Sequence, residues 1–470
     1  MNTLSVRLDN WKRFVGSAAL AALLILVAGG ANALANTVWT VSKTSSVASC
    51  EPAIPGPLVT TCNTIQSAVT AASGYDVIVV GPGKYTEEVT ISGLDGLVLY
   101  GAQAGNDARV GRWDTSKESI VDATGSADGT AFNVQSNYVV IDGFTIQNAK
   151  GASYGAGIWI NCNDCSSYVG YEDDQILNNI IQNNAIGAYL TFSCNALVQH
   201  NLFKTNNNGQ GGSSLWTLKG LGGIGIGGTP DDGSTITENA FTGNKAAAMD
   251  LVAQESGQIT NNTSEKDGAF LVCDFCGPLL VSQNQGRDFG AAGQLPAILP
   301  GKIAADAAID IGDGTSPLQI SENDLEDGKT PNGIAFNPAI NFDGNASSAG
   351  ACQYCLVTNN TIKGFPGNGI VAEMVSGLGT LWESTISRNL LERNGNDGIL
   401  IQGPVSDTNF NYDNQLLSNE ARDNQGIDCV DDTIGSVSTL IGTLGTANTW
   451  YNNSGSTSSP AGLCTPSPWH

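Results

Sequence analysis

The sequence predicts an all-β fold, a right-handed parallel β-helix (solenoid) that carries a short N-terminal capping helix. Three observations predict it. A short phrase ending in asparagine recurs along the chain, segments of alternating apolar and variable residues lie between the copies, and one amphipathic helical segment precedes them all. Gly numbers 58 while only 14% of residues are charged, a composition typical of many tight turns.

The recurring phrase is an aliphatic residue, two mostly polar positions and an asparagine. The nine copies end at Asn179, Asn201, Asn239, Asn262, Asn284, Asn323, Asn360, Asn389 and Asn419. The shortest step, from residue 179 to residue 201, is 22 residues, and the longest, from 284 to 323, is 39. A coil of 22 residues has room for three short strands and their turns, so longer steps indicate insertions on one side. Asparagine suits such turns because it tolerates left-handed backbone angles, and stacked asparagines can satisfy one another in a ladder.

A second phrase, a glycine followed by alternating apolar residues, accompanies several copies, as in Gly157–Ile160 and Gly398–Ile401. Alternation with a period of two indicates a strand with one buried face. The residues expected inside the coil are Ile158, Ile160, Ala188, Leu190, Ile370, Ile399 and Ile401.

The segment around residues 64–72 differs from the repeat. Ile65, Ala68, Val69 and Ala72 share one helical face, with Thr64 or Asn63 as N-cap. A helix here would close the open end of the solenoid. We therefore expect an N-terminal cap over residues 36–74, a parallel β-helix over 75–450 and a C-terminal tail over 451–470.

Residues 1–35 have the pattern of a secretory signal peptide. Basic residues precede an apolar run from Phe14 to Val27, and Ala33 and Ala35 form a small-x-small cleavage site. The run is shorter than the ~20 residues that span a bilayer, so we expect no membrane insertion of the mature chain. The predicted location is secreted, periplasmic or cell-surface. The formal net charge of −24 disfavours nucleic acid as a partner.

The stretch from Thr64 to Gly101 and the segment VVIDGFTIQN from Val139 to Asn148 resemble the exported right-handed β-helix repeat proteins of the pectate lyase-like superfamily. The resemblance spans roughly residues 60–450 and implies the fold. It leaves the activity open, because that superfamily includes lyases, hydrolases, epimerases, esterases and adhesins.

The chain has eleven cysteines, and in an exported protein disulfides persist. Three CxxC units are expected to form local disulfides, Cys162 with Cys165, Cys273 with Cys276 and Cys352 with Cys355. Cys50 with Cys62 would fasten the N-terminal cap, and Cys429 with Cys464 the tail. Cys194 remains, and we expect it to be a small buried residue rather than a reactive thiol.

The candidate ligand-binding residues lie on the strands that follow the glycines, at the position expected to point out of the coil. They are Trp159, Tyr189, Asp250, Phe270 and Asp310. Aromatic faces stack on sugar C–H surfaces and carboxylates accept hydroxyl hydrogens, so such a column suits a saccharide groove. The rival interpretation is that loops bury the rings. We expect Asp250 and Asp310 to lie about three coils apart, roughly 14 Å, too far for a hydrolytic pair.

Two functions remain. The first is a non-catalytic scaffold that binds a polysaccharide, a cell-surface glycan or another surface partner. The second is a polysaccharide lyase or glycosidase acting on an acidic polymer, for which a loose constellation is formed by Arg388, Arg393 and Arg422 beside Glu373, Glu392 and Asp423. No cofactor is required, although the acidic loop from Asp310 to Gly314 could hold calcium. With only His200 and His470, a multi-histidine copper site is disfavoured. The sequence gives neither the catalytic residues nor the oligomeric state.

Overall fold

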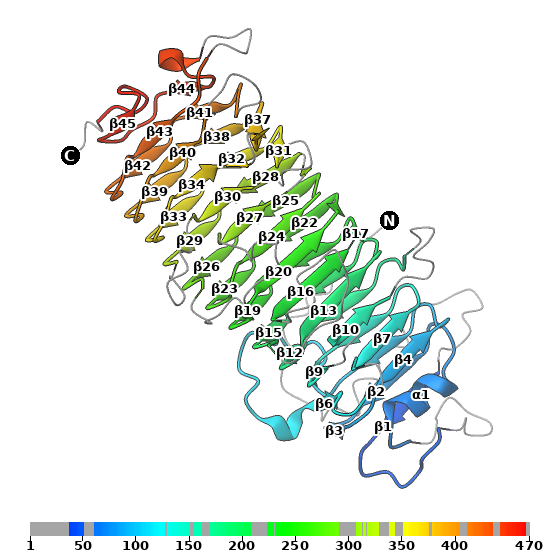
Figure 1. The fold of residues 1–470 in the computed structure, drawn as a ribbon. Coiled ribbons are helices and arrows are strands. Elements are labelled where there is room, and N and C mark those ends of the chain that lie inside the picture. The colour runs from blue at the N-terminus through cyan, green and yellow to red at the C-terminus, as the bar shows by residue number, and fades with distance from the viewer. Residues whose placement is uncertain are drawn as a thin grey trace, which may run out of the picture.

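The computed structural model describes residues 37–50, 61–126, 129–150, 155–161, 170–207, 223–229, 231–290, 307–312, 314–315, 317–328, 338–343, 351–375, 378–403, 411–435 and 442–466. The predicted signal peptide therefore lies outside the described residues, as do Cys162 and Cys165. The described chain winds through three long sheets whose strands are all parallel, and it forms an elongated stack (Figure 1). The right-handed parallel β-helix is confirmed.

Each coil contributes one strand to each sheet, in the order sheet A, sheet B, sheet C. Sheet A has 14 strands: β1 (Val38–Val41), β2 (Val77–Val80), β5 (Val98–Tyr100), β8 (Val140–Asp142), β11 (Gln175–Leu177), β14 (Leu197–Gln199), β18 (Thr235–Thr237), β22 (Gly257–Thr260), β25 (Leu279–Ser282), β28 (Leu318–Ser321), β32 (Leu356–Thr358), β38 (Thr385–Ser387), β41 (Gln415–Leu417) and β44 (Thr449–Tyr451).

Sheet B has 12 strands: β3 (Gly83–Tyr85), β6 (Ser119–Asp122), β9 (Phe144–Gln147), β12 (Ile180–Gln182), β15 (Leu202–Lys204), β19 (Ala240–Thr242), β23 (Thr263–Glu265), β26 (Gln285–Arg287), β29 (Asp324–Glu326), β33 (Thr361–Lys363), β39 (Leu390–Glu392) and β42 (Glu420–Arg422).

Sheet C has 13 strands: β4 (Val89–Ser92), β7 (Phe132–Gln135), β10 (Ala156–Ile160), β13 (Ile186–Thr191), β16 (Ile224–Thr229), β20 (Ala247–Val252), β24 (Leu271–Asp274), β27 (Ile309–Ile311), β30 (Ile340–Phe342), β34 (Ile370–Ala372), β40 (Ile399–Ile401), β43 (Cys429–Asp431) and β45 (Ser458–Ser459). Three two-stranded pairs lie beside these sheets: β17 (Asp231–Asp232) with β21 (Gln254–Glu255), β31 (Cys352–Gln353) with β37 (Leu381–Trp382), and β35 (Met374–Val375) with β36 (Leu378–Gly379).

The nine repeat asparagines form one buried ladder at the turn between sheets A and B. At each step the backbone N–H of one asparagine donates to the side-chain oxygen of the next, as from Asn262 to Asn284 at 2.9 Å. Asn453 extends the ladder beyond Asn419. The left-handed backbone angle belongs to the residue before each asparagine, for example Asn261 with φ of 56°. Hydrogen bonding, rather than tolerance of a left-handed angle, therefore explains the repeat asparagine.

A second ladder, which the recurring phrase did not predict, lies at the turn between sheets B and C. It runs from Asn184 through Asn206 and Asn244 to the carboxylate of Asp267. Burial raises the pKa of the Asp267 carboxyl to about 7, although Ser264 and Asn244 donate hydrogen bonds to it.

The space between the sheets is filled by aliphatic and aromatic side chains. The seven positions expected inside the coil are all at most 1% exposed. Phe203 and Phe241, on equivalent positions of sheet B, stack with ring centroids 5.0 Å apart. Because the same chemical type recurs at the same position, each coil continues the core of its neighbour.

The N-terminal end is closed by helix α1 (Ile65–Ala71), as predicted. Thr64 is its N-cap, and Ile65 is among the residues the helix buries. The carboxylate of Glu87 accepts hydrogen bonds from the N–H groups of Ile65 and Gln66, where it also complements the positive end of the helix dipole. The expected cap segment also holds β1, which already pairs with β2 of the solenoid.

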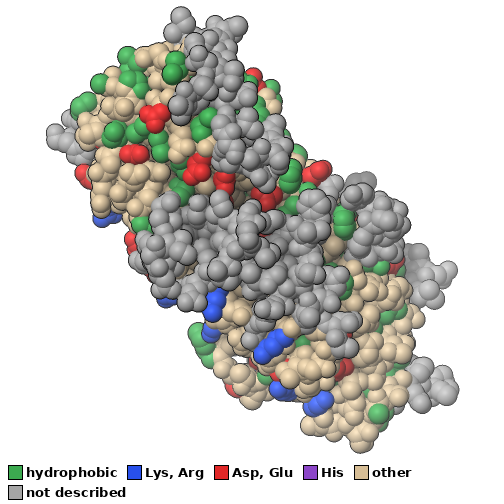
Figure 2. Space-filling model, in the orientation of Figure 1, with side chains coloured by type: hydrophobic (Ala, Val, Ile, Leu, Met, Phe, Trp, Pro, Cys, Tyr) green, Lys and Arg blue, Asp and Glu red, His purple; other side chains and the backbone are tan. Residues whose placement is uncertain are grey.

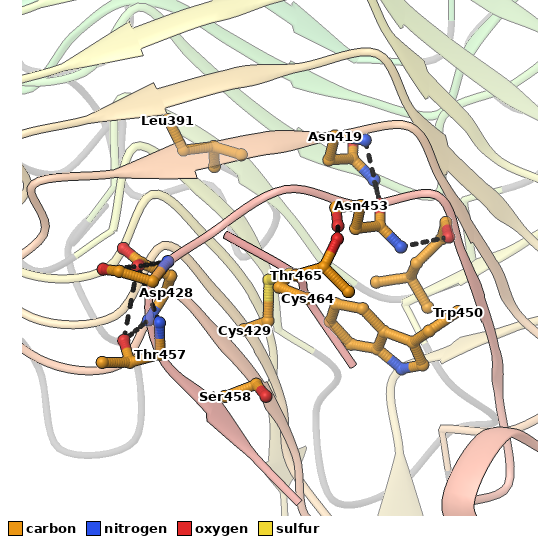
Figure 3. The surroundings of a disulfide bond; sticks show 12 residues. Leu391, Asn419, Asp428, Cys429, Trp450, Asn453, Thr457, Ser458, Cys464 and Thr465 are labelled. Carbon is orange, nitrogen blue, oxygen red and sulfur yellow. Dashed lines mark hydrogen bonds between the residues drawn. A yellow bond between two sulfur atoms is a disulfide. The ribbon is translucent and has the colours of Figure 1, made fainter. Parts of the chain in front are cut away.

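The C-terminal end is fastened by the disulfide between Cys429 and Cys464 (Figure 3). Beside it, the carboxylate of Asp428 accepts hydrogen bonds from Ser456 and Thr457. The side chain of Asp431 accepts one from Nε1 of Trp450. Asp428 therefore holds the tail against the last coil, Asp431 holds β44, which leads into the tail, and β45 within the expected tail joins sheet C.

The other predicted disulfides within the described residues are also present, Cys50 with Cys62, Cys273 with Cys276 and Cys352 with Cys355. Cys194 takes part in none of them and is half-buried rather than buried.

Candidate functional site

The outward column of sheet C contains most of the residues expected to form a ligand groove. Parallel pairing aligns Trp159 with Tyr189, Tyr189 with Gly227, and Gly227 with Asp250. The column continues through Val272 to Asp310. Four of the five predicted residues therefore share one face of one sheet.

The two rings of this column do not face solvent. Trp159 is 9% exposed and Tyr189 is 1% exposed. They belong to a small hydrophobic cluster separate from the main core, and the indole Nε1 of Trp159 donates to Oγ1 of Thr191 at 3.1 Å. Tyr189 also packs over Gly227, where an added Cβ would lie 3.2 Å from its ring. The expectation of an exposed aromatic platform here is wrong, and the rival interpretation of covered rings describes the geometry.

Phe270 does not belong to the column. It is fully buried in the main core, and Val272 occupies the outward position. Pairing through β20, β16 and β13 places Leu271 level with Ile158 and Val272 level with Trp159. The phrase that begins at Gly268 is therefore offset by two residues, and Phe270 lies at the level of Gly157.

Acidic residues from neighbouring coils gather on the outer surface of sheet C, a group called here the acidic face: Asp250, Asp274, Asp310, Asp343 and Glu373. Asp250 and Asp310 lie in the column described above. The other three form a column two residues further along. Asp274 pairs with Val252, the last residue of β20, and Asp343 and Glu373 directly follow β30 and β34. Figure 2 shows acidic side chains on this face of the molecule.

The spacing of these carboxylates differs from the sequence expectation. Asp250 and Asp310 are separated by one intervening coil, so their backbones lie about 10 Å apart at about 4.8 Å per coil. The expected separation of three coils was one coil too many, because β24 ends at Asp274 and its neighbour β27 begins only at Ile309. Asp343 and Glu373, on adjacent coils, lie about 5 Å apart by the same measure.

The acidic face is half-buried and fixed in place. Asp250 is 2% exposed, whereas Asp274, Asp310, Asp343 and Glu373 are of intermediate exposure. The carboxylate of Asp274 lies against Gly312, where an added Cβ would be 1.9 Å from its Oδ1. The Cys273–Cys276 disulfide holds the backbone on both sides of Asp274. Partly desolvated carboxylates in fixed positions are strong hydrogen-bond acceptors.

Sequence reasoning missed Asp274, Asp343 and Glu373. One pattern could have found them. In each of these coils an acidic residue is the last residue of the alternating strand segment or directly follows it. That signal depends on aligning the strands correctly across long insertions, which the repeat phrase alone did not allow.

The arginines considered for a lyase lie on a different face from Glu373. Arg422 ends β42 of sheet B and pairs with Glu392 and Glu420 at 3.5 and 2.8 Å. Arg393 directly follows β39 and pairs with Glu392 at 3.5 Å. Arg393 and Arg422 thus meet Glu392, one of the acids of the expected constellation, whereas Arg388 follows β38 of sheet A and Glu373 follows β34 of sheet C.

Metal binding finds little support in the described part of the chain. It contains no group of three or more His, Cys, Asp or Glu side chains that could hold an ion. His200 pairs with Glu238, with Nε2 2.6 Å from Oε2. Asp313 of the loop considered for calcium lies outside the described residues, so calcium at that loop stays a prediction. Among the residues that the structure describes, no helix is long and apolar enough to cross a membrane.

Comparison with known proteins agrees with this architecture. Residues 87–274 match the sequence model of a family described as periplasmic copper-binding protein (NosD). The catalytic unit of a GH87 α-1,3-glucanase from Streptomyces thermodiastaticus strain HF3-3 is similar in structure, with a TM-score of 0.57 and 14% identity, over 92% of this chain and 71% of that one. A GH87 α-1,3-glucanase catalytic domain in complex with nigerose gives a TM-score of 0.52 and 11% identity, over 85% and 70%. No curated protein sequence matches this chain.

The chain is thus a parallel β-helix protein with the fold of the pectate lyase-like superfamily, as the sequence resemblance implied. Its location is periplasmic or otherwise outside the cytoplasm, in agreement with the N-terminal segment.

Proposed function

We propose that the protein is a glycan-binding β-helix of the cell envelope and that the acidic face is where a neutral polysaccharide binds. The observation that carries the proposal is the placement of four half-buried carboxylates, with the buried Asp250 beside them, on the outer side of sheet C at heights set by the coil repeat. Carboxylates accept hydrogen bonds from sugar hydroxyls, and a regular polymer presents such hydroxyls at regular intervals.

Charge favours a neutral rather than an acidic polymer. The whole chain carries a net charge of −24, and the proposed surface is itself acidic. A polyuronate would be repelled unless cations intervened. The α-1,3-glucanases of similar fold act on a neutral glucan, as their name states, and this supports the choice of ligand class.

Copper does not fit the described residues. Copper sites use imidazole, thiolate and thioether ligands. Met249 is fully buried in the core, and Cys273 and Cys276 are joined in a disulfide. His200 lies beside Glu238 rather than beside another soft ligand. The copper binding in the name of the matching family is therefore not extended to this protein.

The test is retention on insoluble and soluble neutral glucans, measured by affinity electrophoresis. Asp310→Asn and Asp343→Asn each remove one charged acceptor, and we expect retention to weaken roughly ten-fold, since hydrogen bonds to charged groups contribute about 1.5 to 3 kcal/mol. Asp324→Asn is the matched control, because Asp324 is exposed on sheet B, near Asp310 in sequence. Equal retention of all three variants would contradict the proposal.

Glycoside hydrolysis is the second candidate, and the spacing of the carboxylates favours it. Retaining glycosidases hold two carboxyl groups about 5 to 5.5 Å apart and inverting ones about 6.5 to 9.5 Å apart. The backbones of adjacent and alternate coils lie about 4.8 and 10 Å apart, and carboxyl groups carried on them can reach these two separations. Release of reducing ends from α-1,3-glucan by the wild type, and its loss in Asp310→Asn or Asp343→Asn, would establish hydrolysis. Binding without release would leave a non-catalytic scaffold.

A further inference from the structure

Two exposed tyrosines occupy equivalent turns at the edge where the chain enters sheet A. Tyr75 and Tyr138 each lie two residues before a strand, β2 and β8, and Gly96 holds the same position before the intervening β5. Tyr75 is 59% exposed and Tyr138 is 43% exposed. One coil separates them, so their backbones lie about 10 Å apart.

Both tyrosines adopt a left-handed backbone conformation, with φ of 65° and 59°. Bulky residues rarely adopt it. Neighbouring coils place Gly96, Asp173 and Asn195 at this turn, residue types that tolerate the conformation, and later coils adopt it with Ser256, Tyr354 and Glu383. The rings are largely exposed, so burial contributes little to offset the strain. The turn recurs along the solenoid, so the fold imposes the conformation, and what Tyr75 and Tyr138 add to it is a pair of exposed rings.

The ring of Tyr75 lies along the edge rather than projecting freely. A Cβ added at Gly96 would be 2.3 Å from Cδ1 of Tyr75, so the ring rests on this glycine, which it helps to bury. One face of the ring contacts the backbone and the other remains available. The ring therefore extends toward the coil that carries Tyr138.

Polar side chains from the same turns surround the rings. The carboxylate of Asp95 accepts hydrogen bonds from N and Nδ2 of Asn137, and Oδ1 of Asn137 accepts one from N of Glu172. Asp95 and Glu172 are exposed. The charge of Glu172 raises the pKa of the Tyr138 hydroxyl, so this hydroxyl stays protonated and can donate.

We propose that this surface, the tyrosine ridge formed by Tyr75, Tyr138, Asp95, Asn137 and Glu172, is a second binding site for a neutral polysaccharide. Tyrosine faces stack on the C–H surfaces of sugar rings, and the carboxylates accept their hydroxyl hydrogens. The same carboxylates disfavour anionic polymers and anionic membranes. The ridge relies on the proposed function only for the class of ligand, because it lies on the coils of β2 to β8, whereas the acidic face lies on the later coils of β20 to β34.

The experiment measures retention on soluble neutral glucans by affinity electrophoresis with Tyr75→Gly, Tyr138→Gly and the double variant. Glycine removes the ring and also relieves the left-handed strain, so the variants should unfold no earlier than the wild type. Each single variant should weaken retention about 2- to 10-fold, the range expected for one aromatic stack, and the double variant should weaken it further. Tyr451→Ala is the matched control, because Tyr451 is 71% exposed at the other end of sheet A.

Unchanged retention in the double variant would overturn the ridge. If Asp310→Asn weakens retention and the double variant does not, the ridge is wrong and the proposed function stands. If only the double variant weakens retention, the ridge stands and the acidic face is wrong. Absence of retention by the wild type on every neutral glucan would overturn both.

Discussion

The asparagine ladder should carry a large share of the local stability, and Asn262→Ala tests this. The side chain of Asn262 is fully buried and makes four hydrogen bonds. Its Nδ2 donates to the Ile236 carbonyl and to Oδ1 of Asn284, at 2.9 and 3.1 Å. Its Oδ1 accepts from N and Nδ2 of Asn239, at 2.9 and 3.1 Å.

Truncation to alanine removes all four bonds and leaves the N–H of Asn239 buried without this acceptor. With about 1 kcal/mol net for each buried bond, and about 1 to 3 kcal/mol for an unsatisfied donor, we expect a loss of about 3 to 5 kcal/mol. Asn261→Gly is the matched control, since Asn261 is exposed with φ of 56° and glycine adopts that angle freely. Its effect should stay within about 0.5 kcal/mol.

The assay combines chemical denaturation with hydrogen exchange, because a solenoid can open locally around one damaged coil. In Asn262→Ala the amide of Asn239 should lose protection, while amides several coils away keep theirs. A loss below about 1 kcal/mol, or unchanged protection at Asn239, would refute the assignment of stability to the ladder.

Three further predictions follow from burial and covalent structure. Trp159→Ala and Tyr189→Ala should each cost about 3 to 5 kcal/mol and lower Tm without changing glycan retention, whereas lost retention at an unchanged Tm would show that the rings contact the ligand. Thiol counting under denaturant should find few free thiols, ideally one, in protein isolated from its native compartment, and six or more would exclude the disulfide assignment. The pKa of Asp267 in the folded state is raised to about 7, so the folded state binds this proton more tightly than the unfolded state does. The contribution of this proton to the free energy of unfolding is therefore complete below about pH 4 and is lost as the pH rises to about 7. Asp267→Asn should remove that fall and stabilise the protein by about 1 to 3 kcal/mol at pH 8, as measured by urea denaturation, and a wild-type pH dependence in this variant would contradict the cause.

The coil repeat could be predicted from the sequence because its signal is local. An aliphatic residue followed three positions later by an asparagine marks the end of a strand and the buried turn after it. All nine predicted asparagines lie in one ladder. The second ladder could not be predicted in the same way, because some coils have another residue type at the asparagine position. Asp267 replaces asparagine in one coil, and the N–H of Phe365 donates to the ladder in another.

The candidate site could be predicted only in part, because exposure is decided by what covers a strand and not by the direction in which a side chain points. Trp159 and Tyr189 point out of the coil as expected, yet both are buried. Phe270 shows a different limit, because two additional residues after its glycine put Val272, and not Phe270, level with Trp159. Long insertions also concealed how many coils separate Asp250 from Asp310.

The tyrosines in the turns before sheet A are visible in the sequence, but their position in the turn is known only once the strands are aligned. Once β2, β5, β8 and β11 are aligned, Tyr75 and Tyr138 lie where the neighbouring coils have Gly96 and Asp173, residue types suited to left-handed angles. An aromatic residue at such a position is a conflict between local preference and fold, and conflicts of this kind tend to mark functional sites. The same comparison can be applied to Tyr354, which has φ of 58°, is 61% exposed and lies before β32 at the equivalent turn. Its hydroxyl interacts with Glu383 of the next coil, which raises the pKa of Tyr354. A tyrosine beside a carboxylate therefore recurs along this edge, and a polymer lying along the edge would meet the same pair of chemical groups again several coils away.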